Sequence, residues 1–540
     1  MKHSILTLLF ISTLTSIHAQ QTESISISKE KTEVWKSTIT GQIISGEKIS
    51  FGTPVYKVQF DSASSRILVQ LRRMDKKKNK YKKDGTFLVC DSSFKKPLWK
   101  EEIDNFYGDN QFRICRSTNS VLIDSGNELG YYGTGCFSLE FGIKFWHENI
   151  NKALEHPEKP IGICLGTTSG TFSKYPAFRG VDMNSGKKTW TRKMKSFCPS
   201  IQYASLNDST VIAIYGGLHS IDLNTGKGWD IDMKMNNKGY ASAADKSTAA
   251  AVTGGYGALG AVGMMLLSPG SAHTPSTTCS NVLITDSAIY LAGKDHIICC
   301  NKQTGDIIWS DSLQEKQTSK SQILLEDNKL ILINYGYSIN DAGERVNYGE
   351  PFVAAYNPKS GSKYFMENLI DENTNPIVDF SISNSQITLL FPHKAKIISL
   401  EDGKSMNEVA FPEEKYGSLC SLPIKNELLI GEKELNLVPA INSYKDKLIV
   451  KSLKGSWITT NLDETMNQDS IPASNIWTKT GESGKYTFLQ NAGNQTYALM
   501  VNGKTTAYLN VDRILFIADK WLYALKDYEL IRVLVDKSTK

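Results

Sequence analysis

Short apolar runs separated by polar turns recur along almost the whole chain. Residues 280–292 show the pattern clearly, with one apolar stretch before the polar turn at 285–288 and another after it. Runs of this length, rich in Ile, Val and Leu and bounded by Asp, Asn, Ser and Gly, are typical of β-strands joined in hairpins. Amphipathic helical periodicity is scarce. The pattern therefore predicts a nearly all-β protein.

A repeated phrase marks many of these hairpins: Asp, Asn or Ser, then Gly four residues later, then an aromatic residue four after the Gly. The Gly suits an Asx-type turn, because the closing residue commonly needs a positive φ that Gly adopts cheaply. The phrase supplies Gly142 and Trp146, Gly186 and Trp190, Gly226 and Trp229 (one residue early), Gly305 and Trp309, Gly361 and Phe365, Gly403 without the aromatic, and Trp99 without the Gly.

The spacing of these glycines defines the repeating unit. Gly142 and Gly186 are 44 residues apart, and Gly186 and Gly226 are 40 apart. A four-stranded antiparallel unit of this length has the size of a propeller blade. We count seven units up to about residue 412 and predict one β-propeller over 20–540 with about eight blades, seven or nine being the alternatives.

The ends and the gaps of the repeat carry further expectations. A strand at 33–40 or 48–51 would complete the last blade and remove exposed sheet edges. Gly305 and Gly361 are 56 residues apart, which fits one blade with a lengthened loop at 338–345. Gly226 and Gly305 are 79 residues apart, which we interpret as one blade plus an insertion at 235–279.

The phrases resemble the tryptophan-docking repeat of the PQQ-like β-propeller family, whose blades run Tyr-Ala-Leu-Asp-x-x-Thr-Gly-x-x-x-Trp. The best copies are 221–229, 299–309 and 355–365. In that family the Trp packs between neighbouring blades and the Gly closes the turn, so the resemblance implies structural roles for both. The family includes quinoprotein dehydrogenases as well as non-enzymatic scaffolds such as the propeller of the outer-membrane barrel-assembly machinery. The fold alone does not choose between them.

The start of the chain predicts export. Lys2 and His3 precede a mainly apolar run, and Ala19 offers a small residue for cleavage, so residues 1–19 read as a signal peptide. We expect a periplasmic or outer-membrane-associated protein, with an extracellular location as the alternative. No Cys stands just after the apolar run, so a lipid-anchored start is not expected.

The net charge of +5 is concentrated in one place. Residues 72–83 carry eight positive charges and one negative, so the rest of the chain is close to −2. A nucleic-acid partner is therefore not expected. The segment is interpreted as a solvated hairpin tip or as a contact for an anionic surface or partner. Its candidate interaction residues are Arg72, Arg73, Lys76, Lys77 and Lys78.

The insertion is the other candidate for interaction. Residues 247–273 contain no Asp, Glu, Lys or Arg and are rich in Gly and Ala. A packed loop, a contact of 249–267 with a partner or membrane surface, and a membrane span are the alternatives. The spacing G-x-G-x-x-G occurs, but no βαβ pattern surrounds it, so a dinucleotide site is not predicted. The candidate residues are Gly254, Gly257, Gly260, Met264 and Met265.

The remaining chemistry-bearing residues predict no active site. Cys299 and Cys300 suggest the adjacent-cysteine ring of quinoprotein alcohol dehydrogenases, but they lie inside the repeat phrase where sibling units have packing residues. The segment beginning at Asp371 departs from a calcium loop at Pro376 and Ile382. The histidines lack zinc-type spacing. No catalytic, cofactor-binding or metal-binding residue is therefore predicted.

The sequence favours a non-enzymatic, exported propeller that acts as an interaction scaffold and needs no cofactor. We expect a monomeric ring whose partner is an envelope protein or outer-membrane component, since binding commonly resides on loops held by a stiff frame. One alternative is a quinoprotein oxidoreductase that uses pyrroloquinoline quinone with calcium. A carbohydrate-binding or small-molecule-binding propeller is another.

Overall fold

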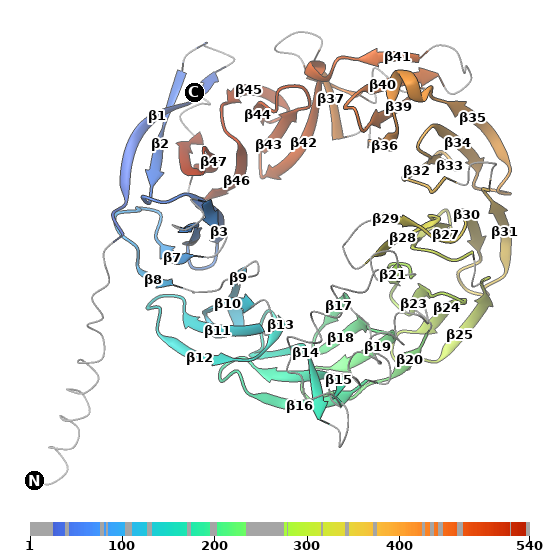
Figure 1. The fold of residues 1–540 in the computed structure, drawn as a ribbon, viewed down its shortest axis with the longest axis horizontal. Helices are drawn as coiled ribbons and strands as arrows, with labels where there is room; N and C mark the ends of the chain where they lie inside the picture. Colours follow the sequence, from blue (N-terminus) through green and yellow to red (C-terminus); the bar gives the residue numbers. More distant parts are fainter. Residues whose placement is uncertain are drawn as a thin grey trace, which may run out of the picture. The chain divides into compact units, whose positions relative to one another are not determined.

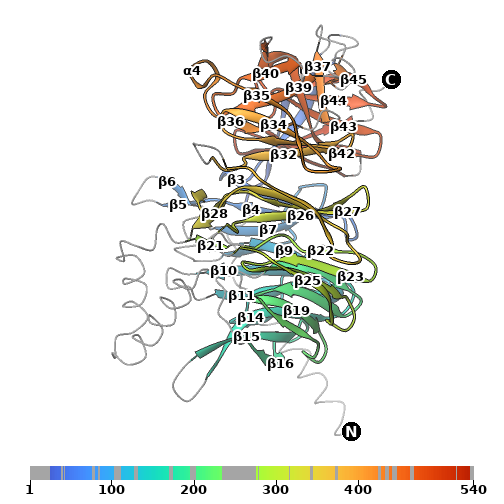
Figure 2. The same ribbon diagram turned by 90° about the vertical axis from the view of Figure 1, so that its right-hand side faces the viewer.

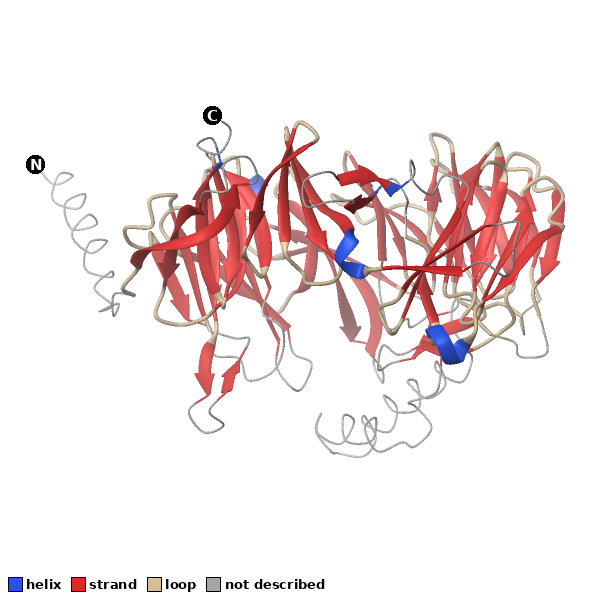
Figure 3. Cartoon of the chain, turned by 90° about the horizontal axis from the view of Figure 1, so that it is seen from above, coloured by secondary structure: helices blue, strands red, loops and turns tan. Residues whose placement is uncertain are grey.

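The structure of the protein is a computed structural model. It describes residues 25–37, 41, 43–75, 80–82, 85–102, 111–126, 132–169, 174–194, 202–233, 275–277, 279–314, 317–340, 345–370, 375–423, 427–431, 437–440, 447–461, 468–518 and 520–535. Strands dominate these ranges, as the red ribbons of Figure 3 show. The described helical elements are η1 (Arg116–Thr118), α4 (Glu413–Tyr416) and η4 (Ala473–Asn475). The all-β prediction is confirmed.

The chain forms two compact units. Unit 1 comprises Met1–Val34, Ile43–Asp104 and Val511–Lys540, and unit 2 comprises Trp35–Gln42 and Asn105–Asn510. Both units are built from antiparallel strands that follow one another along the chain, so most hydrogen-bonded neighbours are close in sequence. Strand β1 (Ser28–Ser37) crosses the division, and its last three residues pair with β45 (Lys504–Leu509) inside unit 2.

Unit 1 joins the two ends of the chain in one sheet. Lys48 of the N-terminal segment pairs with Ile531 of the C-terminal segment, so a strand that contains residue 48 adds to the last strands of the chain, as one of the two predicted alternatives has it. The strand order there is β2 (Ile43–Ser50), β48 (Glu529–Leu534), β47 (Trp521–Lys526) and β46 (Arg513–Ala518). A second sheet contains β3 (Val55–Asp61), β4 (Arg66–Leu71), β7 (Thr86–Cys90) and β8 (Trp99–Glu102), and the hairpin β5 (Arg73–Asp75) and β6 (Lys80–Lys82) lies between β4 and β7 in the sequence.

Unit 2 is a series of four-stranded sheets, which can be followed from cyan to orange in Figure 1. The first three are β9 (Gln111–Cys115), β10 (Ser120–Gly126), β11 (Tyr132–Ser138) and β12 (Lys144–Glu148); β13 (Asn151–Glu155), β14 (Ile161–Ser169), β15 (Lys174–Asp182) and β16 (Lys188–Lys193); and β17 (Gln202–Asn207), β18 (Thr210–Ile214), β19 (Gly217–Asp222) and β20 (Asp230–Asp232). The next three are β22 (Leu283–Ile284), β23 (Ala288–Ala292), β24 (His296–Asn301) and β25 (Ile307–Ser312); β26 (Ser321–Glu326), β27 (Lys329–Asn334), β30 (Phe352–Tyr356) and β31 (Lys363–Asn368); and β32 (Asp379–Ser383), β33 (Gln386–Leu390), β34 (Lys394–Ser399) and β35 (Ser405–Ala410).

Seven four-stranded sheets precede residue 411, the number of units that the sequence predicts there. The strands beyond it are β36 (Leu419–Ser421), β39 (Lys447–Ser452), β40 (Trp457–Asn461) and β41 (Gln468–Ile471), followed by β42 (Ile476–Ser483), β43 (Tyr486–Asn491), β44 (Tyr497–Val501) and β45, with β37 (Leu428–Gly431) and β38 (Leu437–Pro439) on the β42 edge. Separate four-stranded sheets number eight among the described residues. The order β42-β43-β44-β45 in unit 2 and the sheet of β2 with β46–β48 in unit 1 add two further four-strand runs. The architecture is that of propeller blades.

The core of unit 2 lies between neighbouring sheets. One cluster combines Tyr290 and Trp309 of one sheet with Leu332 and Tyr356 of the next. Side chains alternate between the two faces of a strand, so each sheet buries one face against the preceding sheet and the other against the following one. This explains the continuous apolar runs of β23 and β30, whose residues are buried on both faces.

The Gly–aromatic phrase connects neighbouring sheets through close contacts. Gly361 adopts φ +72°, and its N–H donates to the Asn357 carbonyl oxygen at 2.9 Å. A Cβ atom at Gly361 would lie 2.6 Å from Cδ2 of Trp309, which belongs to the preceding sheet. The Trp309 indole N–H donates to the Pro358 carbonyl oxygen at 2.9 Å. Turn and aromatic ring are therefore packed as one joint.

The same joint recurs along unit 2. Trp146 faces Gly186, Trp190 faces Gly226, Trp229 faces Gly305 and Phe365 faces Gly403. The indole N–H groups of Trp146 and Trp190 donate to the carbonyl oxygens of Met183 and Leu223. Trp99, which belongs to unit 1, is buried.

Antiparallel order gives each blade two distinct ends. The turns from strand 1 to 2 and from strand 3 to 4 lie at one end, which contains Gly142, Gly186, Gly226, Gly305, Gly361 and Gly403 and is called the turn end here. The connections from strand 2 to 3, and from strand 4 to the next blade, lie at the opposite end, called the loop end. Interruptions of the repeat at the loop end leave the Gly–aromatic joints intact.

Candidate functional site

The loop end of unit 2 carries a small sheet that belongs to no blade. Its strands are β21 (Pro275–Thr277), β28 (Tyr337–Asn340) and β29 (Arg345–Asn347), in the order β21-β28-β29. β21 comes from the connection between two blades, and the hairpin β28–β29 comes from the strand 2-to-3 connection of a later blade. Figure 2 shows β21 beside β28, where Pro275 pairs with Asn340. Two separate departures from the repeat therefore meet.

A buried polar cluster fixes the base of this sheet to its blade. The amide oxygen of Asn334 accepts from the Ser319 N–H at 2.8 Å, and its amide nitrogen donates to the carbonyl oxygens of Gln317 and Glu350. The Ser319 hydroxyl oxygen accepts from the Gly336 N–H at 2.8 Å. Asn334 and Ser319 are each 1% exposed, so these hydrogen bonds form away from water and hold the start of β28 rigidly.

Aromatic side chains gather beside the small sheet. The Tyr335 ring lies 5.3 Å from the Tyr337 ring and 6.4 Å from the Phe380 ring, centroid to centroid. Its hydroxyl donates to Oε1 of Gln322 at 2.8 Å. Tyr335, Gln322 and Phe380 are half-buried and Arg345 is exposed, with its guanidinium 4.7 Å from the centre of the Tyr337 ring. We call these five residues the Tyr335 cluster.

The electrostatics of the Tyr335 cluster suit recognition better than proton transfer. Burial raises the pKa of Tyr335, and Tyr337 and Asp379 act in the same direction. The phenol therefore remains protonated and serves as a hydrogen-bond donor. The Arg345 guanidinium lies over the Tyr337 ring, and the N–H groups in the plane of the guanidinium can donate to a carboxylate. Tyr and Arg next to other aromatic side chains are the residues that most often dominate protein–protein interfaces.

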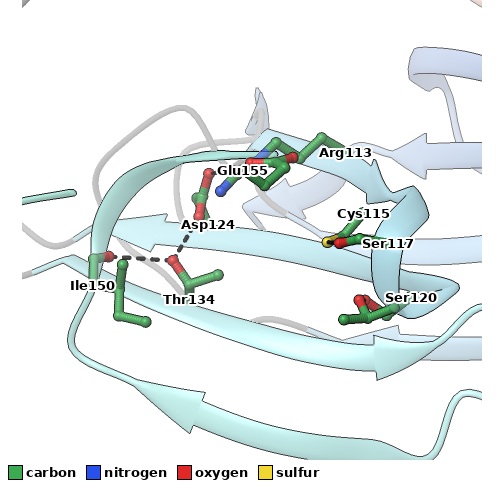
Figure 4. A network of polar contacts seen from close by, with 9 residues as sticks. Arg113, Cys115, Ser117, Ser120, Asp124, Thr134, Ile150 and Glu155 are labelled. Atoms are coloured by element: carbon green, nitrogen blue, oxygen red, sulfur yellow. Dashed lines mark hydrogen bonds and ion pairs between the residues drawn. The ribbon is translucent and has the colours of Figure 1, made fainter. Parts of the chain in front are cut away.

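A second polar network joins two neighbouring blades of unit 2. Arg113 of β9 directs Nε to both carboxylate oxygens of Glu155 on β13, each at 3.0 Å, and forms an ion pair with Asp124 of β10. The Thr134 hydroxyl donates to Oδ1 of Asp124 at 2.6 Å, and the Ile150 carbonyl oxygen lies 3.2 Å from the same hydroxyl. Figure 4 shows the guanidinium between the two carboxylates.

This network has two carboxylates for one guanidinium in a largely buried place. Burial raises the pKa of Glu155, although Arg113 opposes the shift. Burial lowers the pKa of Arg113, but Asp124 and Glu155 outweigh it and the net shift is upward. Because Arg113 of one blade pairs with Asp124 of its own blade and with Glu155 of the next, the arrangement serves as a charged tie between blades.

The basic segment lies in unit 1 as a hairpin. Arg73 pairs with Lys82 across β5 and β6, while Lys76, Lys77 and Lys78 lie outside the described residues. The Arg72 guanidinium is 4.7 Å from the Tyr528 ring centre and 5.4 Å from that of Tyr56. Arg72 thus lies at the base of the hairpin, in contact with two aromatic faces.

The Gly/Ala-rich insertion reaches the described part of the chain only at its end. Gly254, Gly257, Gly260, Met264 and Met265 lie outside the described residues, as does the proposed contact segment 249–267. Strand β21 is the described part of 235–279 that pairs with another element. Among the described residues, no helix has both the length and the apolar composition needed to cross a bilayer.

The adjacent cysteines occupy two different cores. Cys299 packs with Trp309 and Tyr290 on one face of β24, and Cys300 packs with Ile289 and Leu291 on the other. Both thiols are free. Burial raises the pKa of Cys299, and burial together with Cys299 raises that of Cys300 to about 12. The pair that suggested a quinone-linked ring consists of packing residues on opposite faces of one strand.

This placement predicts that Cys299 and Cys300 resist alkylation. At pH 8 a thiol with a pKa near 12 is ionised in about one molecule in 10⁴, and the thiolate is the reactive form. We expect iodoacetamide to leave both residues unmodified in the folded protein and to modify both after unfolding. Peptide mapping by mass spectrometry distinguishes them from the other cysteines. Rapid labelling of the folded protein, or a Cys299–Cys300 disulfide, would contradict the packing assignment.

No metal centre is found in the described ranges, where no three His, Cys, Asp or Glu residues are grouped as metal ligands. Two of the histidines are buried with partners. His219 is 2.5 Å from Oδ1 of Asp230 and 2.9 Å from the Tyr215 carbonyl oxygen. His156 accepts from the N–H groups of Glu158 and Lys159 through Nδ1.

Sequence reasoning missed the residues of the Tyr335 cluster. The sequence predicted a lengthened loop at 338–345, which lies within the hairpin β28–β29, but it gave no role to the aromatic pair Tyr335 and Tyr337. Tyr335-Gly-Tyr337 interrupts the blade pattern immediately after a regular strand, and that interruption was the available signal. The contact with Phe380 was not available, because it comes from the next blade.

Comparison with known proteins adds little to this picture. No protein-family model and no curated protein sequence matches the chain. The chain is similar to BamB from Moraxella catarrhalis (10% identity, TM-score 0.30, covering 75% of this chain and 95% of that one), the Pan2 WD40 domain of Neurospora crassa (13%, 0.26, 76% and 90%) and Sqt1 of Saccharomyces cerevisiae (8%, 0.31, 76% and 96%). At TM-scores below 0.5 these similarities carry no functional argument, and the blade architecture rests on the strand pairing described above.

Proposed function

We propose that this protein is a non-enzymatic, exported scaffold that binds an envelope protein through the loop end of unit 2. One observation carries the proposal. The two additions β21 and β28–β29 pair with each other beside half-buried aromatic residues and the exposed Arg345. The blades supply a stiff frame, and the added elements supply a surface with the composition of a protein interface.

The proposed function requires no cofactor. The quinoprotein alternative was suggested by the adjacent residues Cys299 and Cys300, whose positions do not support it. Cys299 and Cys300 belong to separate cores. The carbohydrate-binding alternative would use the same aromatic faces, since sugar rings also pack on them. No observation on this chain favours it over a protein partner.

A pull-down with a matched pair of charge reversals tests the proposal. Arg345→Glu changes an exposed residue of the Tyr335 cluster, and Lys404→Glu changes an exposed residue at the turn end of the same unit. We expect the wild-type protein and Lys404→Glu to retain the same protein from detergent-solubilised envelope of the source organism, and Arg345→Glu to lose most of it, about tenfold or more. Wild-type protein that enriches nothing, or equal retention by both variants, would refute the proposal.

A further inference from the structure

The small sheet at the loop end has one strand fewer than the blades around it. β29 is its last strand, with β28 on one side and no described strand on the other. An edge of this kind presents backbone N–H and C=O groups to which another chain can pair. β29 lies beside the Tyr335 cluster, so backbone and side-chain recognition would occur together.

The hydrogen-bond pattern shows which residues face the open edge. The Tyr348 N–H donates to the Gly336 carbonyl oxygen at 3.1 Å, and Val346 lies opposite Ser338. Backbone groups alternate in direction along an antiparallel strand, so those of Val346 and Tyr348 point to β28. Those of Arg345 and Asn347 therefore point away from β28 and give two donors and two acceptors to which a partner strand can pair.

We propose that an extended segment of the partner protein adds to β29 as a fourth strand, with an acidic side chain next to Arg345 and an apolar one against Tyr335 and Phe380. The inference rests on the proposed function and specifies how that partner is recognised. Arg345 is exposed and its guanidinium is already positioned over Tyr337, so a carboxylate is the complementary group. Main-chain pairing gives affinity in such additions, and side-chain contacts give specificity.

Asn347→Pro tests the backbone pairing directly. Proline removes the N–H that faces the open edge, while the ladder between β28 and β29 uses the groups of Val346 and Tyr348. We expect this variant to retain at least about tenfold less of the envelope protein than wild type, because the strand loses a hydrogen bond and its open edge is blocked. Asn347→Ala keeps the N–H and is expected to retain the protein within about twofold of the wild-type amount.

Amide hydrogen exchange on the complex isolated from the envelope gives a second measurement that does not depend on folding of the proline variant. Arg345 and Asn347 should exchange at least about tenfold more slowly in the complex, whereas Val346 and Tyr348 should change little because they already bond to β28. Unchanged exchange at Arg345 and Asn347 would overturn the strand addition.

The outcomes separate the two proposals. Loss of binding by Arg345→Glu with full binding by Asn347→Pro would refute strand addition and leave the scaffold proposal standing. Failure of the wild-type protein to retain any partner would refute both. Self-association of the purified protein that Asn347→Pro abolishes would assign the edge to a second copy of this chain and overturn the partner-strand proposal.

Discussion

Replacing Gly361 with alanine should destabilise unit 2 by about 2–4 kcal/mol. Part of this loss, about 1–2 kcal/mol, is the cost of placing an L-residue at a φ near +72°. The rest arises because the new Cβ atom would lie 2.6 Å from the Trp309 ring, so the joint between two blades must open or distort. Urea unfolding followed by tryptophan fluorescence measures the change.

Gly455→Ala is the matched control. Gly455 also has a positive φ, +83°, but a Cβ atom there would have no neighbour within 4 Å. This variant should lose only the conformational part, about 1–2 kcal/mol. Equal losses for Gly361→Ala and Gly455→Ala would show that the contact with Trp309 adds nothing, and that the phrase requires Gly for its backbone conformation alone.

These two glycines illustrate how much of the fold the sequence could predict. The phrase around Gly361 combines a turn residue, a positive φ and an aromatic ring at fixed spacing, so it is recognisable wherever it occurs. Each local preference agrees with the blade architecture, which is why seven units could be counted before residue 411. A nearly all-β fold of four-stranded sheets followed from that count.

The C-terminal part was harder to divide because its turns use other residues. Gln495 adopts φ +59°, and its N–H donates to the Asn491 carbonyl oxygen at 3.0 Å. Gly361 makes the corresponding bond to Asn357. Because Gln495 fills the left-handed position, the Gly that marks the repeat is missing four residues after Asn491, although Gly493 lies within the turn. The sequence suggested one blade where the described strands form three further four-strand runs.

The sequence could indicate the candidate site only as a place where the blade repeat is interrupted. The lengthened loop at 338–345 and the insertion at 235–279 both interrupt the repeat, and the described strands β28, β29 and β21 lie at the loop end. Their pairing through β21 and β28, and the contact of Tyr335 with Phe380, join segments that are distant in the sequence. No local pattern encodes such contacts, because they depend on how successive blades are arranged.

Replacing Arg113 with methionine should destabilise unit 2 by about 3–5 kcal/mol at pH 7, because two largely buried carboxylates lose their cation. The loss should be smaller at pH 5. Burial already raises the pKa of Glu155 in the folded protein. A carboxyl group whose pKa is higher in the folded than in the unfolded protein contributes its full stability below the unfolded-state pKa. That stability is lost as the pH rises through the folded-state pKa. Without Arg113, an ionised Glu155 destabilises the folded protein more than it does in wild type. Partial protonation of Glu155 at pH 5 therefore restores more stability to the variant than to wild type.

Urea unfolding at both pH values distinguishes this tie from an ordinary surface ion pair. Lys404→Met removes the cation of the exposed pair with Asp402 and should cause no measurable change at either pH. Glu155→Gln removes the titrating carboxylate, so its stability relative to wild type should increase from pH 5 to pH 7. A loss for Arg113→Met that is the same at both pH values, or as small as that of Lys404→Met, would mean that hydration of the two carboxylates replaces the guanidinium. The blades would then be held together by their apolar cores and the Gly–aromatic joints alone.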